Sequence, residues 1–234
     1  MRRILPLSIL LLALFATACE PTVAVTGFDI GRMFPTTTDH FWKYNRSDDA
    51  TVAYMLTEGA TSPAGEEWSA YRFYFGDEAE MVNAFAADRG TWDHWSAVLY
   101  FKERPAGWYF MGWDSNPDRL DIGTMLMDDD GIPFAVGNAF PDSNWTGSGG
   151  GKAWTVTTTG PVAEPLEFNG QVVESAWHMN LASDSEDTAL EGDWWLVQGT
   201  GIVQFDVSGL DQGELSGWQH QHNDVIANIT GVPN

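Results

Sequence analysis

The sequence predicts an all-β protein built on an antiparallel curved sheet, a half-barrel or a sandwich, with at most one short helix. Two observations support this prediction. Short apolar runs rich in aromatic and β-branched residues recur along the chain, separated by Gly, Pro, Asn and Asp, which is typical of strands and turns. Strands do not alternate with long helices anywhere, so a parallel α/β fold is not expected.

The first half of the chain carries five such runs. We expect strands at 40–44, 51–57, 68–75, 92–102 and 107–113. In the third run, Trp68 and Tyr74 fall on one face of the strand, while Tyr71, Phe73 and Phe75 fall on the other. Because both faces are apolar, one side packs on a core and the other on a second layer or along a cleft. A strongly curved sheet and a sandwich both satisfy this pattern.

The second half continues in the same way, with strands expected at 153–159, 172–181, 194–207 and 214–219. The segment from Trp194 to Val207 contains two apolar runs around Gly199-Thr200-Gly201. Glycine permits a positive φ angle or a bulge, so this segment is predicted to form two adjacent strands or one bent strand. Replacing Gly201 should therefore destabilise the fold.

Two segments depart from the strand pattern. Between Asp77 and Ala87, the residues Met81, Val82 and Phe85 have helical spacing and Asp77 can cap the helix, so this is the one candidate helix. The glycine-rich stretch at 147–151 is either a hairpin loop or the boundary between two sub-domains.

The N-terminus is predicted to be a targeting signal. A basic start, an apolar zone from Ile4 to Phe15 and the small residues Ala16-Thr17-Ala18 precede Cys19. The apolar zone is too short to cross a bilayer, which takes roughly 20 residues. Exported proteins normally use cysteines in pairs, yet Cys19 is the only cysteine in the chain. We therefore predict a signal peptide at 1–18, lipidation of Cys19, a tether at 19–33 and a β-rich domain at 34–234. Ordinary cleavage after Ala18 is the alternative.

Composition limits the partners. The formal net charge is −22, and such an acidic surface repels nucleic acid and anionic lipid headgroups. The chain is nevertheless 44% hydrophobic with 12 Trp, which is enough apolar surface for a folded core. With a single cysteine, that core must form without disulfides. Because the acidic surface repels anionic lipid headgroups, the expected membrane contact is through an N-terminal lipid alone.

Several short motifs resemble a loose group of bacterial envelope lipoproteins. The residues before Cys19 resemble a lipobox, with Ala16 in place of the preferred leucine. The mature part begins with Phe34-Pro35 and an aromatic strand at 41–44, and its second half opens with Pro133-Phe134-Ala135-Val136-Gly137. It ends with Trp194-Trp195, then Gly199-Thr200-Gly201-Ile202-Val203, then Glu214-Leu215. The resemblance implies an antiparallel β fold in the envelope and implies no reaction. By the sorting rule of enteric lipoproteins, Glu20 after the cysteine implies the outer membrane.

The sequence offers little that indicates catalysis. There is no Gly-x-Ser-x-Gly elbow, phosphate-binding glycine loop or dinucleotide fingerprint. The five histidines His40, His94, His178, His220 and His222 are scattered, and the three in predicted strands are interpreted as structural. His220 and His222, with no third ligand identified, are weak evidence for a metal site. We therefore predict no enzyme activity, no catalytic or metal-binding residue and no cofactor.

Acidic turns and exposed aromatic residues are the remaining candidates. The stretches Asp128-Asp129-Asp130-Gly131 and Asp114-x-Asn116-x-Asp118 supply oxygen donors of the kind calcium binds, but neither completes an EF-hand loop, so both are interpreted as solvated turns. Most Trp residues lie where a core needs them. Trp145, in an expected loop from Asn138 to Gly151, is the best candidate for an exposed aromatic ring that stacks on a ligand.

These observations lead to three hypotheses. The first is a lipid-anchored envelope protein with a non-enzymatic binding or structural role. The second is a carrier or receptor for an apolar or glycan ligand. The third is a glycan hydrolase that uses paired acidic residues, which leave no linear signature.

Overall fold

The computed structural model describes residues 41–47, 51–77, 79, 95–128, 130–136, 142–161, 166–168, 171–173, 176–185, 188–197 and 200–219. Every named element within these residues is a β-strand, which confirms the all-β prediction. Several predicted features lie outside the described residues. They are Cys19 with the signal and tether, most of the candidate helix after Asp77, and His40, His94, His220 and His222.

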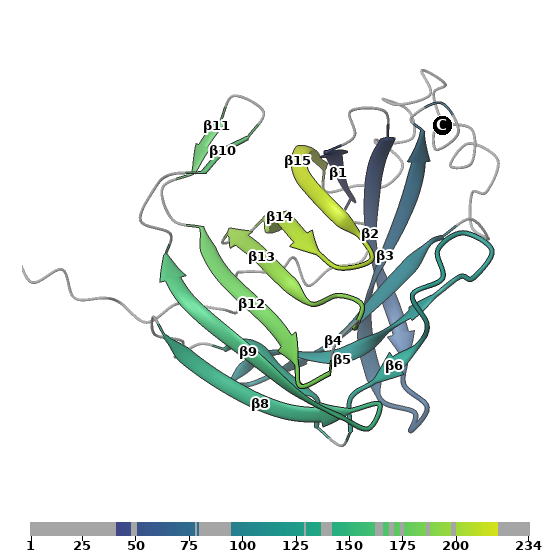
Figure 1. Cartoon of the computed structure of the whole chain (residues 1–234), viewed down its shortest axis with the longest axis vertical. Helices are drawn as coiled ribbons and strands as arrows, with labels where there is room; N and C mark the ends of the chain where they lie inside the picture. The colour runs from purple at the N-terminus through teal and green to yellow at the C-terminus, as the bar shows by residue number, and fades with distance from the viewer. Residues whose placement is uncertain are drawn as a thin grey trace, which may run out of the picture.

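The first seven strands form one half of a large antiparallel sheet (Figure 1). We call this the first half-sheet. Its strands are β1 (Phe41–Arg46), β2 (Thr51–Thr61), β3 (Glu67–Asp77), β4 (Ala97–Arg104), β5 (Gly107–Ser115), β6 (Met125–Leu126) and β7 (Ile132–Val136). Neighbouring strands from β1 to β6 pair in sequence order, and β7 pairs with β5.

The second half-sheet continues directly from the first, because β15 pairs with β1. From β1 outward the order is β15, β14, β13, β12, β9 and β8. These strands are β8 (Ser143–Gly149), β9 (Lys152–Pro161), β12 (Trp177–Ser183), β13 (Gly192–Val197), β14 (Gly201–Val207) and β15 (Asp211–Gln219). A hairpin of β10 (Leu166–Phe168) and β11 (Gln171–Val173) forms a separate two-stranded sheet, and its strand β10 contacts β15 (Figure 1).

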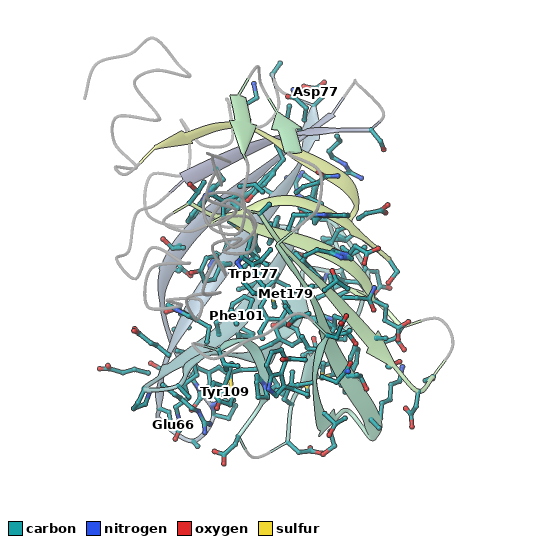
Figure 2. The ribbon with its side chains drawn as sticks, turned by 90° about the vertical axis from the view of Figure 1, so that its left-hand side faces the viewer. Glu66, Asp77, Phe101, Tyr109, Trp177 and Met179 are labelled. Carbon is teal, nitrogen blue, oxygen red and sulfur yellow. The ribbon has the colours of Figure 1, made fainter. Side chains whose placement is uncertain are left out.

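The sheet curves so that its two halves face each other across an aromatic core. In Figure 2, Phe101 of the first half-sheet and Trp177 and Met179 of the second lie in the space between them. Ring contacts join the halves: Trp113 and Trp154 have centroids 5.5 Å apart, and Phe134 and Trp194 have centroids 6.2 Å apart. Among the residues that the structure describes, six tryptophans are buried, as the core interpretation predicted: Trp42, Trp108, Trp113, Trp154, Trp177 and Trp194.

Two hydrogen bonds from buried side chains of β1 hold this strand against the start of β14. The indole N–H of Trp42 donates to the carbonyl of Thr200 at 2.7 Å, and the hydroxyl of Tyr44 donates to the carbonyl of Ile202 at 2.8 Å. Both side chains are fully buried. Each contact satisfies a polar group that would otherwise be costly to bury.

The two ends of the sheet meet at a short seam but do not form a continuous ladder. An isolated bridge joins Met127 to Gly149, and the N–H of Asp128 donates to the carbonyl of Ser148 at 2.7 Å. We call these two contacts the seam. The backbones approach closely there, since a Cβ on Gly149 would lie 2.7 Å from the Cα of Met127.

The structure confirms one detailed prediction and corrects two others. Strands β13 and β14 are adjacent and antiparallel, and Gly201 has a φ of 86°. The run predicted at 172–181 is not one strand, because β11 ends at Val173 and β12 begins at Trp177. The expected loop from Asn138 to Gly151 contains strand β8, and Gly150 and Gly151 form the turn into β9.

Candidate functional site

The outer face of the second half-sheet follows from strand alternation. In β12, Trp177, Met179 and Leu181 are buried in the core, so His178 and Asn180 point to the other side. In β13, Trp194 and Leu196 are buried in the same way. Asp193 and Trp195 therefore point outward beside His178 and Asn180.

His178 lies between a hydroxyl group and a carboxylate. Its Nδ1 is 2.6 Å from Oγ1 of Thr159, and its Nε2 is 2.7 Å from Oδ1 of Asp193. Because an ionised carboxylate can only accept hydrogen bonds, the neutral ring carries its proton on Nε2. Nδ1 then accepts a hydrogen bond from the hydroxyl group of Thr159. Three strands thus contribute one polar group each to a chain of hydrogen bonds.

A β-bulge places the hydroxyl group of Thr159. His178 pairs with Gly160 and Met179 pairs with Thr158, so Thr159 is the extra residue of β9. A bulge redirects a side chain relative to its neighbours. Here it leaves Thr158 buried in the core and Thr159 exposed on the outer face beside the imidazole.

Two further side chains hold this arrangement. The ring of Trp195 stacks on that of His178 with centroids 5.0 Å apart and an interplanar angle of 22°. The amide of Asn180 donates to Oδ1 of Asp193 at 2.9 Å. We call these five residues, Thr159, His178, Asn180, Asp193 and Trp195, the His178 cluster. Its members are half-buried apart from the exposed Thr159, and Trp195 also packs in part against the core, so their orientation is fixed while part of each remains accessible.

The His178 cluster meets part of the requirement for nucleophilic catalysis. A hydroxyl, a base and an orienting carboxylate are in hydrogen-bond contact. However, Thr159 is a β-branched secondary alcohol, whose methyl group restricts rotation and crowds its oxygen. A flat aromatic ring surrounded by fixed polar groups is better suited to binding a ligand through stacking and hydrogen bonds.

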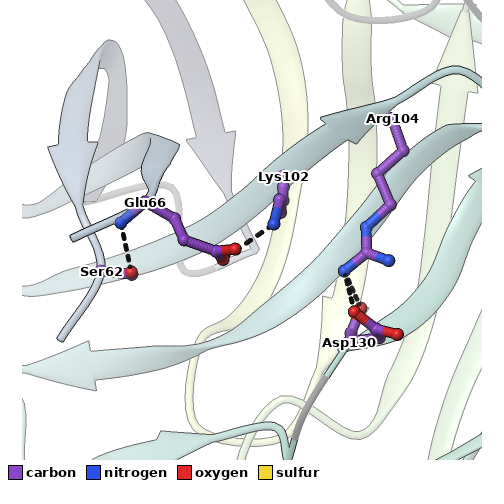
Figure 3. A network of polar contacts seen from close by, with 5 residues as sticks. All are labelled: Ser62, Glu66, Lys102, Arg104 and Asp130. Carbon is purple, nitrogen blue, oxygen red and sulfur yellow. Dashed lines mark hydrogen bonds and ion pairs between the residues drawn. The ribbon is translucent and has the colours of Figure 1, made fainter. Parts of the chain in front are cut away.

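A second polar network lies on the first half-sheet (Figure 3). Lys102 pairs with Glu66 at 2.8 Å, and Nη2 of Arg104 donates to Oδ1 of Asp130 at 2.8 Å. These hydrogen bonds hold the pKa of Glu66 and of Asp130 below the usual carboxyl range. The guanidinium of Arg104 also lies 4.5 Å from the centre of the Tyr109 ring. These cations are already neutralised by carboxylates at the surface, so the network is interpreted as structural.

The acidic turns do not converge on one point. Asp130 accepts a hydrogen bond from Arg104. Asp114 accepts hydrogen bonds from the hydroxyl of Thr124 and the N–H of Ser115. Oδ1 of Asn116 accepts from the N–H of Asp118 at 3.1 Å. Within the described ranges, no group of three or more His, Cys, Asp and Glu side chains is arranged to hold a metal ion.

The aromatic residue singled out from the sequence is not the one in the His178 cluster. Trp145 was expected in a loop, but it lies in β8 and is partly buried against the core. Its indole is on the inner side because the exposed residues Asn144 and Thr146 alternate with it. Sequence reasoning missed Thr159 and Asp193, which lie far from His178 along the chain. The only available signal was the alternation of His178 and Asn180 with apolar residues.

Comparison with known proteins identifies no relative of this chain. No helix in the described part of the chain is long and apolar enough to cross a membrane. No protein-family model, curated protein or solved structure matches the chain.

Proposed function

We propose that this chain is a lipid-anchored protein of a bacterial cell envelope that binds a ligand, without catalysis, on the outer face of its second half-sheet. The order of basic, apolar and small residues before the single Cys19 supports the anchor. The observation that supports the binding role is the fixed His178 cluster. Preorganised side chains lose little conformational freedom when a ligand binds, which favours affinity.

The inner face offers less support for a binding role. The space between the half-sheets contains large aromatic side chains in mutual contact, such as Trp108 beside Phe101 and Trp194 beside Phe134. All four are buried to 2% exposure or less. A carrier of an apolar ligand would have to displace such rings. The outer face requires no rearrangement, so we place the binding role there.

The anchor is tested in the natural host. Mass spectrometry of the N-terminal peptide should show acyl chains on Cys19, and a Cys19→Ser variant should move from the membrane to the soluble fraction. A Cys19→Ser protein that stays in the membrane fraction would contradict the anchor.

The binding role is tested with the full mature chain carrying Cys19→Ser, by co-sedimentation with envelope fragments. Trp195→Ala should lose retention, because it removes the stacking surface. Tyr109→Ala, an aromatic truncation on the first half-sheet, is the matched control and should be retained. Equal retention of both variants contradicts the proposed site. Hydrolysis of an activated ester that disappears in Thr159→Ala would contradict the non-enzymatic role.

A further inference from the structure

A row of polar side chains crosses five neighbouring strands of the second half-sheet. Strand register places the members directly opposite one another, from β8 through β9, β12 and β13 to β14. All are exposed or half-buried. In order across the sheet they are Asn144, Thr157, Asn180, Asp193 and Asp206. We call this set the polar row.

The polar row is long and partly preorganised. Neighbouring strands lie about 4.8 Å apart, so its four steps span roughly 19 Å. The hydroxyl of Thr157 donates to Oδ1 of Asn144 at 2.6 Å, and Asn180 donates to Asp193 at 2.9 Å. These contacts fix the amide and carboxylate groups while leaving other donor and acceptor positions on them for a ligand.

The stacked rings of His178 and Trp195 flank the polar row at its centre. Trp195 follows Asp193 by two residues on the same face of β13, which is about 6.8 Å along the strand. His178 precedes Asn180 by two residues on β12, and its ring stacks on Trp195. One side of the row therefore borders a flat aromatic surface, while both of its ends are exposed.

The charge of this face excludes one large class of ligand. The polar row contains two carboxylates, Asp193 and Asp206, and no cation, in a chain of net charge −22. Anionic polymers would be repelled. Amides and carboxylates instead accept hydrogen bonds from neutral hydroxyl groups, and the apolar face of a sugar ring stacks on tryptophan.

We infer that the ligand is a neutral polysaccharide, which lies across the strands along the polar row with one sugar ring on Trp195. This inference rests on the binding role proposed above for the same face. The spacing between strands is comparable to the length of one pyranose unit, so consecutive sugars meet consecutive members of the row. Affinity should then grow with chain length until the row is filled, and stay constant beyond it.

The experiment is isothermal titration of the full mature chain carrying Cys19→Ser. The probes are neutral glucose, mannose and galactose oligosaccharides of increasing length and both linkage types, with polygalacturonate as the anionic comparison. Binding should rise with length up to about five sugars, one for each member of the polar row. Asn180→Ala and Trp195→Ala should each weaken binding about tenfold, the change that corresponds to 1.4 kcal/mol. Tyr109→Ala should bind as the unaltered protein does.

The outcomes separate this inference from the binding role. If Trp195→Ala loses retention on envelope fragments but none of the neutral oligosaccharides binds, the polysaccharide inference is overturned and the binding site stands. If Trp195→Ala is retained on the fragments, the site itself fails. Preference for polygalacturonate, or equal affinity in Asn180→Ala and the unaltered protein, also overturns the inference.

Discussion

The seam between the sheet ends can be tested with one methyl group. A Cβ built on Gly149 would lie 2.7 Å from the Cα of Met127 and 2.8 Å from the carbonyl oxygen of Leu126. Both are backbone atoms, so the strain cannot be relieved by rotating a side chain. Gly149→Ala should therefore push the two sheet ends apart and break the Asp128–Ser148 hydrogen bond.

The cost follows from two contributions. Overpacking in a tightly packed region costs about 1–3 kcal/mol. Loss of the seam hydrogen bond adds about 0.5–1.5 kcal/mol. The free energy of unfolding should fall by about 2–4 kcal/mol in total. For a domain of this size that corresponds to a Tm lower by roughly 5–15 °C.

The matched control is Gly59→Ala in β2, where an added Cβ meets nothing within 4 Å. This substitution should be neutral or slightly stabilising, because alanine reduces the freedom of the unfolded chain. Thermal denaturation measures both variants, and hydrogen exchange at the Asp128 amide reports the seam directly. If Gly149→Ala and Gly59→Ala melt at the same temperature, the seam does not stabilise the sheet and the reasoning is refuted.

Three further predictions concern the core. Tyr44→Phe removes the hydroxyl that donates to Ile202 and should lower the Tm by roughly 2–6 °C, with an unchanged melting curve as the contrary result. Burial raises the pKa of both Tyr44 and Tyr71 well above the usual value. Both keep their protons in the fold while unfolded tyrosines lose theirs, so stability should be intact below about pH 10 and fall above it by about 1.4 kcal/mol per tyrosine per pH unit. Tyrosinate absorbance that rises before the protein unfolds would contradict this. Gly201→Val should cost about 1–3 kcal/mol, because Gly201 has a φ of 86°, and equal thermal stability would count against it.

The sequence indicated the strands whose side chains build the core. Segments such as 68–75 and 194–207 combine aromatic and β-branched residues with turn residues at their ends, and those signals are local. Gly201 could be singled out because glycine is the residue that adopts a positive φ without strain.

Strand β8 could not be predicted in this way. Its sequence, Ser-Asn-Trp-Thr-Gly-Ser-Gly, has the composition of a loop. It is extended because every residue from Ser143 to Gly149 pairs with β9, and this pairing is a tertiary effect. The loop composition also led to the prediction that Trp145 is exposed, whereas alternation along β8 turns its side chain toward the core.

The His178 cluster could not be predicted from sequence motifs, because it also depends on tertiary pairing of strands. His178, Thr159 and Asp193 come from three strands, and their contacts depend on cross-strand register and on the bulge at Thr159. A histidine in a predicted strand does not by itself indicate a functional site. The polar row likewise depends on four cross-strand registers, which join β8, β9, β12, β13 and β14.

The position of β1 between β2 and β15 has a consequence for how the chain folds. Phe41 pairs with Gln219, so β1 finds its second neighbour only after the chain has been made as far as β15. Until then β1 presents an open edge, which other chains can pair with. Contacts between residues so distant in sequence also slow folding, because a long loop must close before they form. The sheet therefore stays incomplete until β15 has been made, and truncation within β15 would expose two edges at once, on β1 and on β14.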